Sequence, residues 1–247
     1  MTVAGNGNEC TAPGSDCGDD GPATDAALAG PYGVWVDPTG LLFIADGRRG
    51  IREVHPDGTI TTVGAAGGTY DIRSVAGDTE GNLYAASNNP DFLLKINLAD
   101  GKTTKVVGTG TSGYNGTTDP DTGMHLPGTK VQINHPEGLS IGLDGDVVFA
   151  DTANNLIRAY VPRFDDVIEL GGLISNGKPQ GGFNGNGQYA DQTKFDHPEA
   201  VTVTRGVLFV VADSGNHVVR KFGPIPLSSA SRRRPPSGRR PPRAGKG

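Results

Sequence analysis

Two histidines stand in the same short setting, and they are the first candidates for chemistry. His135 and His197 each precede a proline, and each is followed two residues later by a glutamate, Glu137 or Glu199. Imidazole and carboxylate groups are the ligands that divalent metals such as Zn²⁺ take in proteins. Brought together, the two sets would make a metal site with His135 and His197 as ligands. Repetition of a structural motif would give the same pattern, so both interpretations stay open.

Two glycine-rich motifs resemble catalytic or nucleotide-binding signatures, and both fail on their context. Gly138–Gly142 matches G-x-S-x-G, but Ser140 lies inside an alternating strand-like run and not on the strand-to-helix elbow that exposes a nucleophile. Gly108–Gly113 matches G-x-G-x-x-G, yet no helix can start directly after it to hold a pyrophosphate. Neither motif predicts a site.

Acidic clusters are a third possible source of chemistry, because carboxylates bind Ca²⁺. None of them has the spacing of an EF-hand loop, so solvated acidic surface is the simpler interpretation. The clusters are Asp16/Asp19/Asp20, Asp119/Asp121 and Asp144/Asp146.

The composition shows which elements must position these groups. The 247 residues include 39 glycines and 18 prolines, and only 35% are hydrophobic. Helical bundles exclude this much Gly and Pro from their interiors. No stretch approaches the ~20 apolar residues of a membrane-spanning helix. The composition predicts an all-β protein of many short strands.

The net charge of −5 combines two unlike parts. Residues 228–247 contain seven basic side chains and no acidic one, which predicts a disordered Arg/Pro-rich tail. The remaining residues carry 15 basic and 27 acidic groups, a formal charge of −12. A body this acidic has no electrostatic reason to bind nucleic acid.

An internal repeat organises residues 1–227. Each unit has a proline, an alternating run, a turn with glycine, a run ending in Ala-Asp, a second turn, and a run containing arginine; unit two is degenerate. Four short strands joined by tight turns form an antiparallel sheet, and a repeat of such sheets predicts a β-propeller. The expected blades span about 31–66, 70–109, 134–171 and 197–226.

Within the units, an acid and a base recur at fixed positions. One carboxylate per blade beside a turn is typical of a structural device that accepts backbone N–H groups. The arginine six or seven residues later is a candidate partner for it. These positions are Asp46, Asp151 and Asp213, with Arg52, Arg158 and Arg220.

The recurring residues follow the pattern P-x-G-[VL]-x-[VI], then [LV]-[FY]-[IVF]-A-D, then [IV]-R. This pattern resembles the NHL repeat. The stretch Gly18–Pro31 is similar to the linkers of many bacterial NHL proteins. Propellers of that family usually have six blades. Four are expected here, closed by residues 2–5 as the fourth strand of the last blade; an incomplete arc or a piece of a six-bladed propeller is the alternative.

The two cysteines and the innermost strands supply the remaining candidates. Cys10 and Cys17 lie in a loop rich in Gly and Pro, which fits a small disulfide and an extracellular or periplasmic location; free thiols in a cytoplasmic protein are the alternative. The innermost strands of a propeller start near the channel mouth, which predicts a ligand-facing rim. The residues expected there are Tyr32, Arg73, Glu137 and Glu199.

Three functions compete on this evidence. Since no complete catalytic set is visible, the favoured one is a non-catalytic scaffold that binds a protein, peptide or glycan, with no cofactor. The second is a metal-dependent enzyme similar to propeller lactonases and lyases, with Ca²⁺ or Zn²⁺ at the channel mouth. The third is a structural module of a larger protein.

Overall fold

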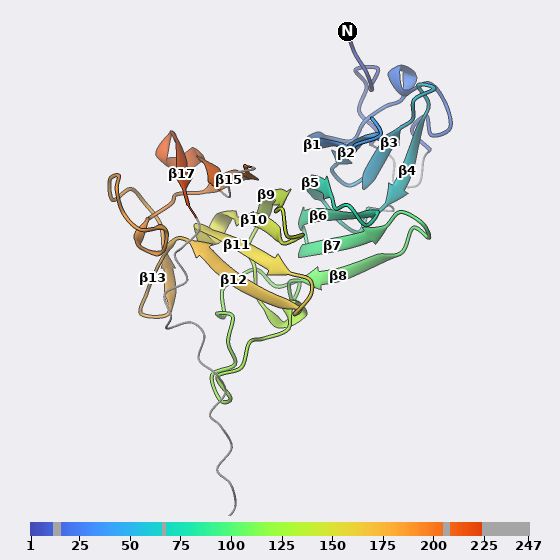
Figure 1. Ribbon diagram of the computed structural model, residues 1–247. Coiled ribbons are helices and arrows are strands. Elements are labelled where there is room, and N and C mark those ends of the chain that lie inside the picture. The colour runs from blue at the N-terminus through green and yellow to red at the C-terminus, as the bar shows by residue number, and fades with distance from the viewer. Residues whose placement is uncertain (12–15, 66–67, 205–207, 224–247) are drawn as a thin grey trace, which may run out of the picture.

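The computed structural model describes residues 1–11, 16–65, 68–204 and 208–223. The basic segment 228–247 lies outside these ranges, so the prediction of a disordered tail stays a prediction. The described residues form four antiparallel blade sheets in chain order and one separate two-stranded hairpin (Figure 1). Blade 1 contains β1 (Pro31–Val36), β2 (Leu42–Asp46), β3 (Ile51–Val54) and β4 (Ile60–Gly64). Blade 2 contains β5 (Ile72–Gly77), β6 (Asn82–Asn88), β7 (Asp91–Asn97) and β8 (Thr103–Val107). Blade 3 contains β9 (Pro136–Ile141), β10 (Val147–Asp151), β11 (Leu156–Val161) and β12 (Asp166–Gly171), and blade 4 contains β15 (Pro198–Val203), β16 (Phe209–Asp213) and β17 (Val218–Phe222).

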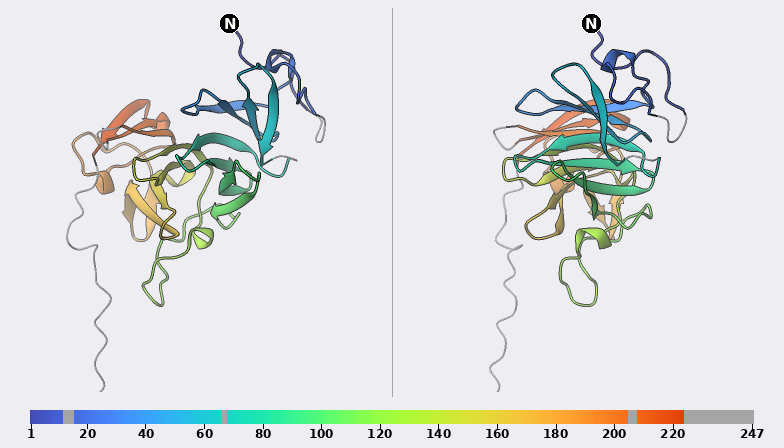
Figure 2. Two further views of the ribbon diagram at one scale, coloured as in Figure 1. Left: turned by 45° about the vertical axis from the view of Figure 1, so that its right-hand side comes forward. Right: turned by 90° about the vertical axis from the view of Figure 1, so that its right-hand side faces the viewer.

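The four blades follow one another around an arc, with their first strands on the inside (Figures 1 and 2). Strand β1 contacts β5, β5 contacts β9, and β9 contacts β15. The prediction of an all-β propeller with four antiparallel blades is confirmed. Every helix in the described part of the chain is a three-residue 3-10 turn, and none could cross a membrane.

The core lies between the blades because central strands are buried on both faces. All five residues of β10 are buried, and their side chains alternate in direction. Phe149 packs toward blade 2 with Leu93, whereas Val148 packs toward blade 4 with Phe209. A third cluster around Phe43 joins blades 1 and 2. Each sheet is therefore stabilised by its neighbours, as radial packing requires.

The N-terminal residues do not close the last blade, which corrects the expectation for residues 2–5. Within the described residues blade 4 has three strands, and the N-terminus lies beside blade 1 (Figure 2). The N–H of Gly5 donates to the carbonyl of Ala23, and Ala4 packs on a cluster that includes the fully buried Ile60. Burial of these apolar groups against the outer part of blade 1 holds the segment there.

The connections between blades contain short elements that the repeat pattern did not indicate. A hairpin of β13 (Leu173–Ser175) and β14 (Lys178–Gln180) lies between blades 3 and 4. The 3-10 turns are η1 (Ala23–Asp25), η2 (Gly128–Lys130), η3 (Thr152–Asn154), η4 (Ala190–Gln192) and η5 (Ser214–Asn216).

Candidate functional site

The same irregularity begins the inner strand of every blade. In blade 1, Pro31 pairs with Asp46 and Gly33 pairs with Ala45, so Tyr32 is an extra residue in a β-bulge. The register shifts at the equivalent point in the other three blades, at Arg73, Glu137 and Glu199. Bulges redirect the side chain of the extra residue. The four rim residues expected from the sequence therefore share one backbone geometry.

The residue after the bulge is small in each blade, because the inner strands approach closely there. These residues are Gly33, Ser74, Gly138 and Ala200. A Cβ atom on Gly138 would lie 2.5 Å from the Cα of Ala200 and 2.6 Å from the carbonyl oxygen of Glu199. Both neighbours are backbone atoms that cannot rotate away. The small residues thus let adjacent bulges come together.

We expect Gly138→Ala to destabilise the protein by about 1–3 kcal/mol, since β15 must move away from β9. Urea denaturation followed by far-UV circular dichroism measures the change. Gly223→Ala is the matched control, because its added Cβ would meet only the Cδ2 of Leu208 at 3.8 Å. Equal losses for both variants would contradict the close-approach argument.

The four bulge residues line one cavity of about 480 Å³ at the inner face of the arc. Every blade contributes to its wall. The full lining is Tyr32, Gly33, Arg73, Ser74, Glu137, Gly138, Leu139, Glu199, Ala200 and Val201. Its volume lies in the range of small-ligand sites. The structure therefore brings together all four residues that the sequence placed on a ligand-facing rim.

The described lining of this inner cavity contains one basic side chain, Arg73, and two acidic ones, Glu137 and Glu199. The guanidinium of Arg73 lies 3.9 Å from the centre of the Tyr32 ring, and its Nη2 is 2.8 Å from Oδ2 of Asp71. Burial raises the pKa of Glu137, and the negative charge of Glu199 raises it further. Arg73 opposes both effects, as do His135 and His197. The two glutamates, on adjacent blades, therefore repel each other electrostatically.

A second cavity, of about 410 Å³, shares Arg73 with the first. Its lining is polar, with several amide, hydroxyl and carboxylate groups. The lining consists of Asp71, Arg73, Asn88, Asn89, Pro90, Asp91, Gly110, Ser112 and His135. The repeat pattern gave no reason to single out Asp71 or Asp91, since both stand outside the positions that recur.

The two histidines have a local structural explanation. Both adopt the left-handed backbone conformation, with φ of 50° at His135 and 47° at His197, where His is enriched among non-glycine residues. Their N–H groups donate to Oδ1 of Asp91 and of Asn155, at 3.1 and 2.8 Å. Their Nδ1 atoms lie 2.9 Å from Oδ1 of Asn134 and 2.7 Å from Oδ1 of Asp196.

The metal interpretation gains no further ligand from this geometry. Among the residues that the structure describes, no three His, Cys, Asp or Glu side chains are grouped as metal ligands. Ser140 is also explained locally, because its Oγ accepts a hydrogen bond from the N–H of Val203 at 3.3 Å and so joins blades 3 and 4.

The recurring aspartates tie blades 1, 3 and 4 to the linkers that precede them. Oδ1 of Asp151 accepts the N–H of Asn134 at 2.7 Å, and Oδ1 of Asp213 accepts the N–H of Asp196 at 2.7 Å. Asp46 accepts two such bonds, from Ala29 and Gly30. The acceptor thus reaches back 16 or 17 residues, and not across the adjacent turn as the sequence suggested.

The recurring arginines complete this connection. Nη1 of Arg158 lies 2.9 Å from Oδ2 of Asp151 and donates to the carbonyl of Gln132 at 3.0 Å. Nε of Arg220 lies 2.8 Å from Oδ2 of Asp213, and Nη1 of Arg52 approaches Oδ2 of Asp46 at 3.6 Å. Blade 2 has Ser87 and Leu94 at these positions and lacks the pair.

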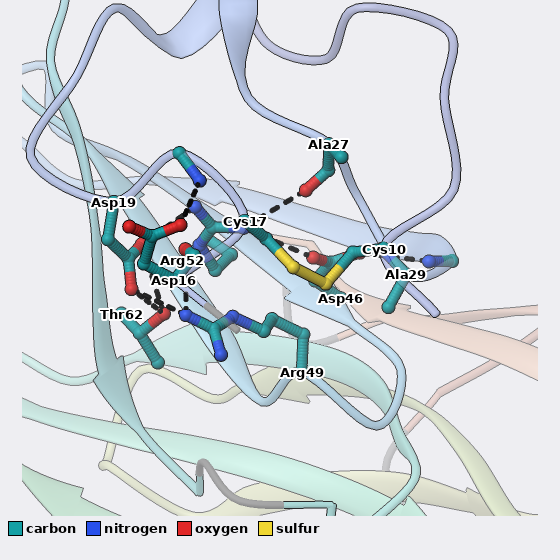
Figure 3. Close-up of a disulfide and its surroundings, with 12 residues drawn as sticks. Cys10, Asp16, Cys17, Asp19, Ala27, Ala29, Asp46, Arg49, Arg52 and Thr62 are labelled. Atoms are coloured by element: carbon teal, nitrogen blue, oxygen red, sulfur yellow. Dashed lines mark hydrogen bonds and ion pairs between the residues drawn. A yellow bond between two sulfur atoms is a disulfide. The ribbon is translucent and has the colours of Figure 1, made fainter. Parts of the chain in front are cut away.

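The linker before blade 1 is held by a disulfide and by Asp19 (Figure 3). The predicted bond between Cys10 and Cys17 is present, with their Cα atoms 5.8 Å apart. Asp19 binds Nη2 of Arg49 at 2.6 Å and Nη2 of the fully buried Arg52 at 2.7 Å, and it also accepts from Thr62. The expectation of solvated acidic surface is therefore wrong for Asp19.

The acidic turn between β9 and β10 supplies a pH-dependent prediction. Burial raises the pKa of Asp146 to about 6, with help from the charge of Asp144. A raised pKa means that the folded state binds the proton more tightly, so this group's contribution to stability falls as the pH rises from about 4 to about 6. We expect Asp146→Asn to be more stable than the natural protein by about 1–2 kcal/mol at pH 7, and equally stable near pH 4.

Thermal melts at several pH values test this expectation. Asp57→Asn is the control, because the backbone N–H of Thr59 lowers the pKa of that exposed carboxyl and its loss should have the opposite pH dependence. A pH-independent effect of Asp146→Asn would contradict the argument.

Comparisons with known proteins agree with this fold. A family profile described as Teneurin NHL domain matches residues 1–79. Teneurin-4 of Mus musculus is 26% identical over an alignment of 263 positions, gaps included, that covers 88% of this chain and 9% of that protein. Teneurin-3 of Mus musculus is 36% identical over 99 residues, or 40% of this chain and 4% of that protein. The chain therefore spans about a tenth of the length of these relatives.

Solved structures show the same architecture. An auxiliary nutrient binding protein from Bacteroides thetaiotaomicron superimposes with a TM-score of 0.61 at 19% identity, over 78% of this chain and 47% of that one. A protein of unknown function from the same organism gives 0.60 at 14% identity, over 77% and 46%. Together, the repeats, the four blade sheets and these similarities show a β-propeller that is similar to the NHL domains of teneurins.

Proposed function

We propose that this propeller is a non-catalytic binding module that holds a protein, peptide or glycan partner in the inner cavity. The observation that carries the proposal is the repeated bulge. One backbone geometry directs an aromatic, a cationic and two anionic side chains into a single space. Constant backbone with varied side chains is what recognition of a particular ligand requires, since fold alone does not set function.

The disulfide supports an extracellular or periplasmic place of action. Cys10 and Cys17 are paired, and such bonds persist in oxidising compartments. Mass spectrometry of the native protein after thiol alkylation tests this: two unmodified cysteines support it, and two alkylated cysteines favour the cytoplasm.

Arrays of short peptides and of glycans test the binding function. The natural protein is expected to bind a subset of the array, and Tyr32→Ala is expected to lose at least tenfold in affinity for that subset. Tyr189→Ala is the matched control, because both tyrosines are exposed, at 56% and 77%, and Tyr189 does not line the cavity. No binding at all, or equal loss in the two variants, would reject the proposal and leave a structural module.

A further inference from the structure

The chemistry of the inner cavity narrows the ligand class, an inference that rests on the proposed function. Glu137 and Glu199 project from adjacent inner strands into the same space. Within the described residues, no hydrogen-bond donor or ion-pair partner within contact distance satisfies either carboxylate. Carboxylates that share a site and lack donors favour an incoming cation, because it relieves their mutual repulsion.

Arg73 does not cancel this negative charge. Among the described residues that line the cavity it is the only basic one, and its guanidinium is already paired with Asp71 at 2.8 Å. Its Cζ also lies over the Tyr32 ring, 3.9 Å from the ring centre, a cation–π contact that holds the guanidinium beside Tyr32. Arg73 and its partner Asp71 together carry no net charge, which leaves the charges of Glu137 and Glu199 uncompensated.

The remaining wall suits the stem of a basic side chain. Leu139 and Val201 also line the cavity, and both are buried apolar residues, at 7% and 6% exposure. Lysine and arginine place their methylene groups along apolar surface while the charged end stays among polar groups. A cavity of about 480 Å³ has room for such a side chain with part of its backbone.

We propose that the inner cavity recognises a guanidinium or ammonium group of a basic peptide, held between Glu137 and Glu199. Its aliphatic stem lies on Leu139 and Val201. The exposed face of the Tyr32 side chain contacts the peptide beside it.

Acetyl-Gly-Arg-Gly-amide is a suitable probe, with its citrulline analogue as a neutral match of the same shape. Titration of the full chain, followed by calorimetry or by amide chemical shifts, should give saturable binding of the arginine peptide. Binding of the citrulline peptide should be at least tenfold weaker. The double variant Glu137→Gln/Glu199→Gln should also lose at least tenfold, while Glu80→Gln, an exposed glutamate between β5 and β6, should bind normally.

Different results separate the two proposals. Equal binding of arginine and citrulline peptides, or unchanged binding by the double glutamine variant, overturns the cation proposal. If the arginine peptide does not bind, and neutral peptides or glycans bind but lose affinity in Tyr32→Ala, the binding function stands and its ligand is neutral. Unchanged melting temperatures of the variants show that any loss comes from the cavity and not from unfolding.

Discussion

Replacing Asp151 with alanine is expected to lower the free energy of unfolding by about 3–5 kcal/mol. Both Asp151 and its partner Arg158 are fully buried, and the nearest atoms of the pair are 2.9 Å apart. The substitution leaves the buried guanidinium with the carbonyl of Gln132 and, at 3.7 Å, the carboxylate of Glu169, and it also removes the acceptor for the N–H of Asn134. Urea denaturation measures the loss.

Two further variants show whether charge is the cause. Asp144→Ala removes the acid of an exposed pair with Arg163 at 4.0 Å, and it should change stability little because surface ion pairs contribute little. Adding Arg158→Met to Asp151→Ala removes the unpaired buried charge and should recover part of the loss. A double variant that is less stable than the single one would show that packing of the arginine, and not its charge, dominates.

Replacing Asp19 with alanine is expected to cost about 2–4 kcal/mol, although its place in an acidic, glycine-rich linker suggests a neutral substitution. Its carboxylate holds both Arg49 and the fully buried Arg52, whose other carboxylate, on Asp46, is 3.6 Å away. Loss of Asp19 therefore leaves a buried guanidinium poorly paired. It should also loosen the linker that covers the outer side of blade 1.

Thermal unfolding and amide hydrogen exchange of residues 16–28 measure these two effects. Asp25→Ala is the matched control, because Asp25 is an exposed acid of the same linker. Similar melting temperatures for the two variants would contradict the assigned role of Asp19. Protection of the linker amides that is unchanged in Asp19→Ala would show that Asp19 is not needed to hold the linker on blade 1.

The strand pattern could be predicted because it is a local property. Alternation of apolar residues, the prolines at strand entry and the turn glycines place the blades as expected: strands β5 to β8, residues 72–107, lie within the blade predicted at about 70–109. The N-terminal segment could not be placed this way. Four small residues carry no information about which apolar surface they will cover, and they pack on blade 1 through Ala4.

The bulges also could not be predicted from the sequence, for a related reason. A bulge is a mismatch between two strands, so neither strand shows it in its own periodicity. The sequence marked Tyr32 and its equivalents only as residues at the start of the innermost strands. The register of β1 against β2 shows why they share a direction.

By itself, the sequence determined the repeat and the four blade sheets. It also determined the repeat positions that hold an aspartate or an arginine, and the inner-strand position that holds a different residue type from blade to blade. Only the tertiary structure decided which charges find partners. Asp19 meets two arginines 30 and 33 residues away, whereas Glu137 and Glu199 meet across two blades with no donor between them in the described chain. The physical reason is that pairing between distant residues depends on how the blades pack, and local residue preferences do not encode that packing.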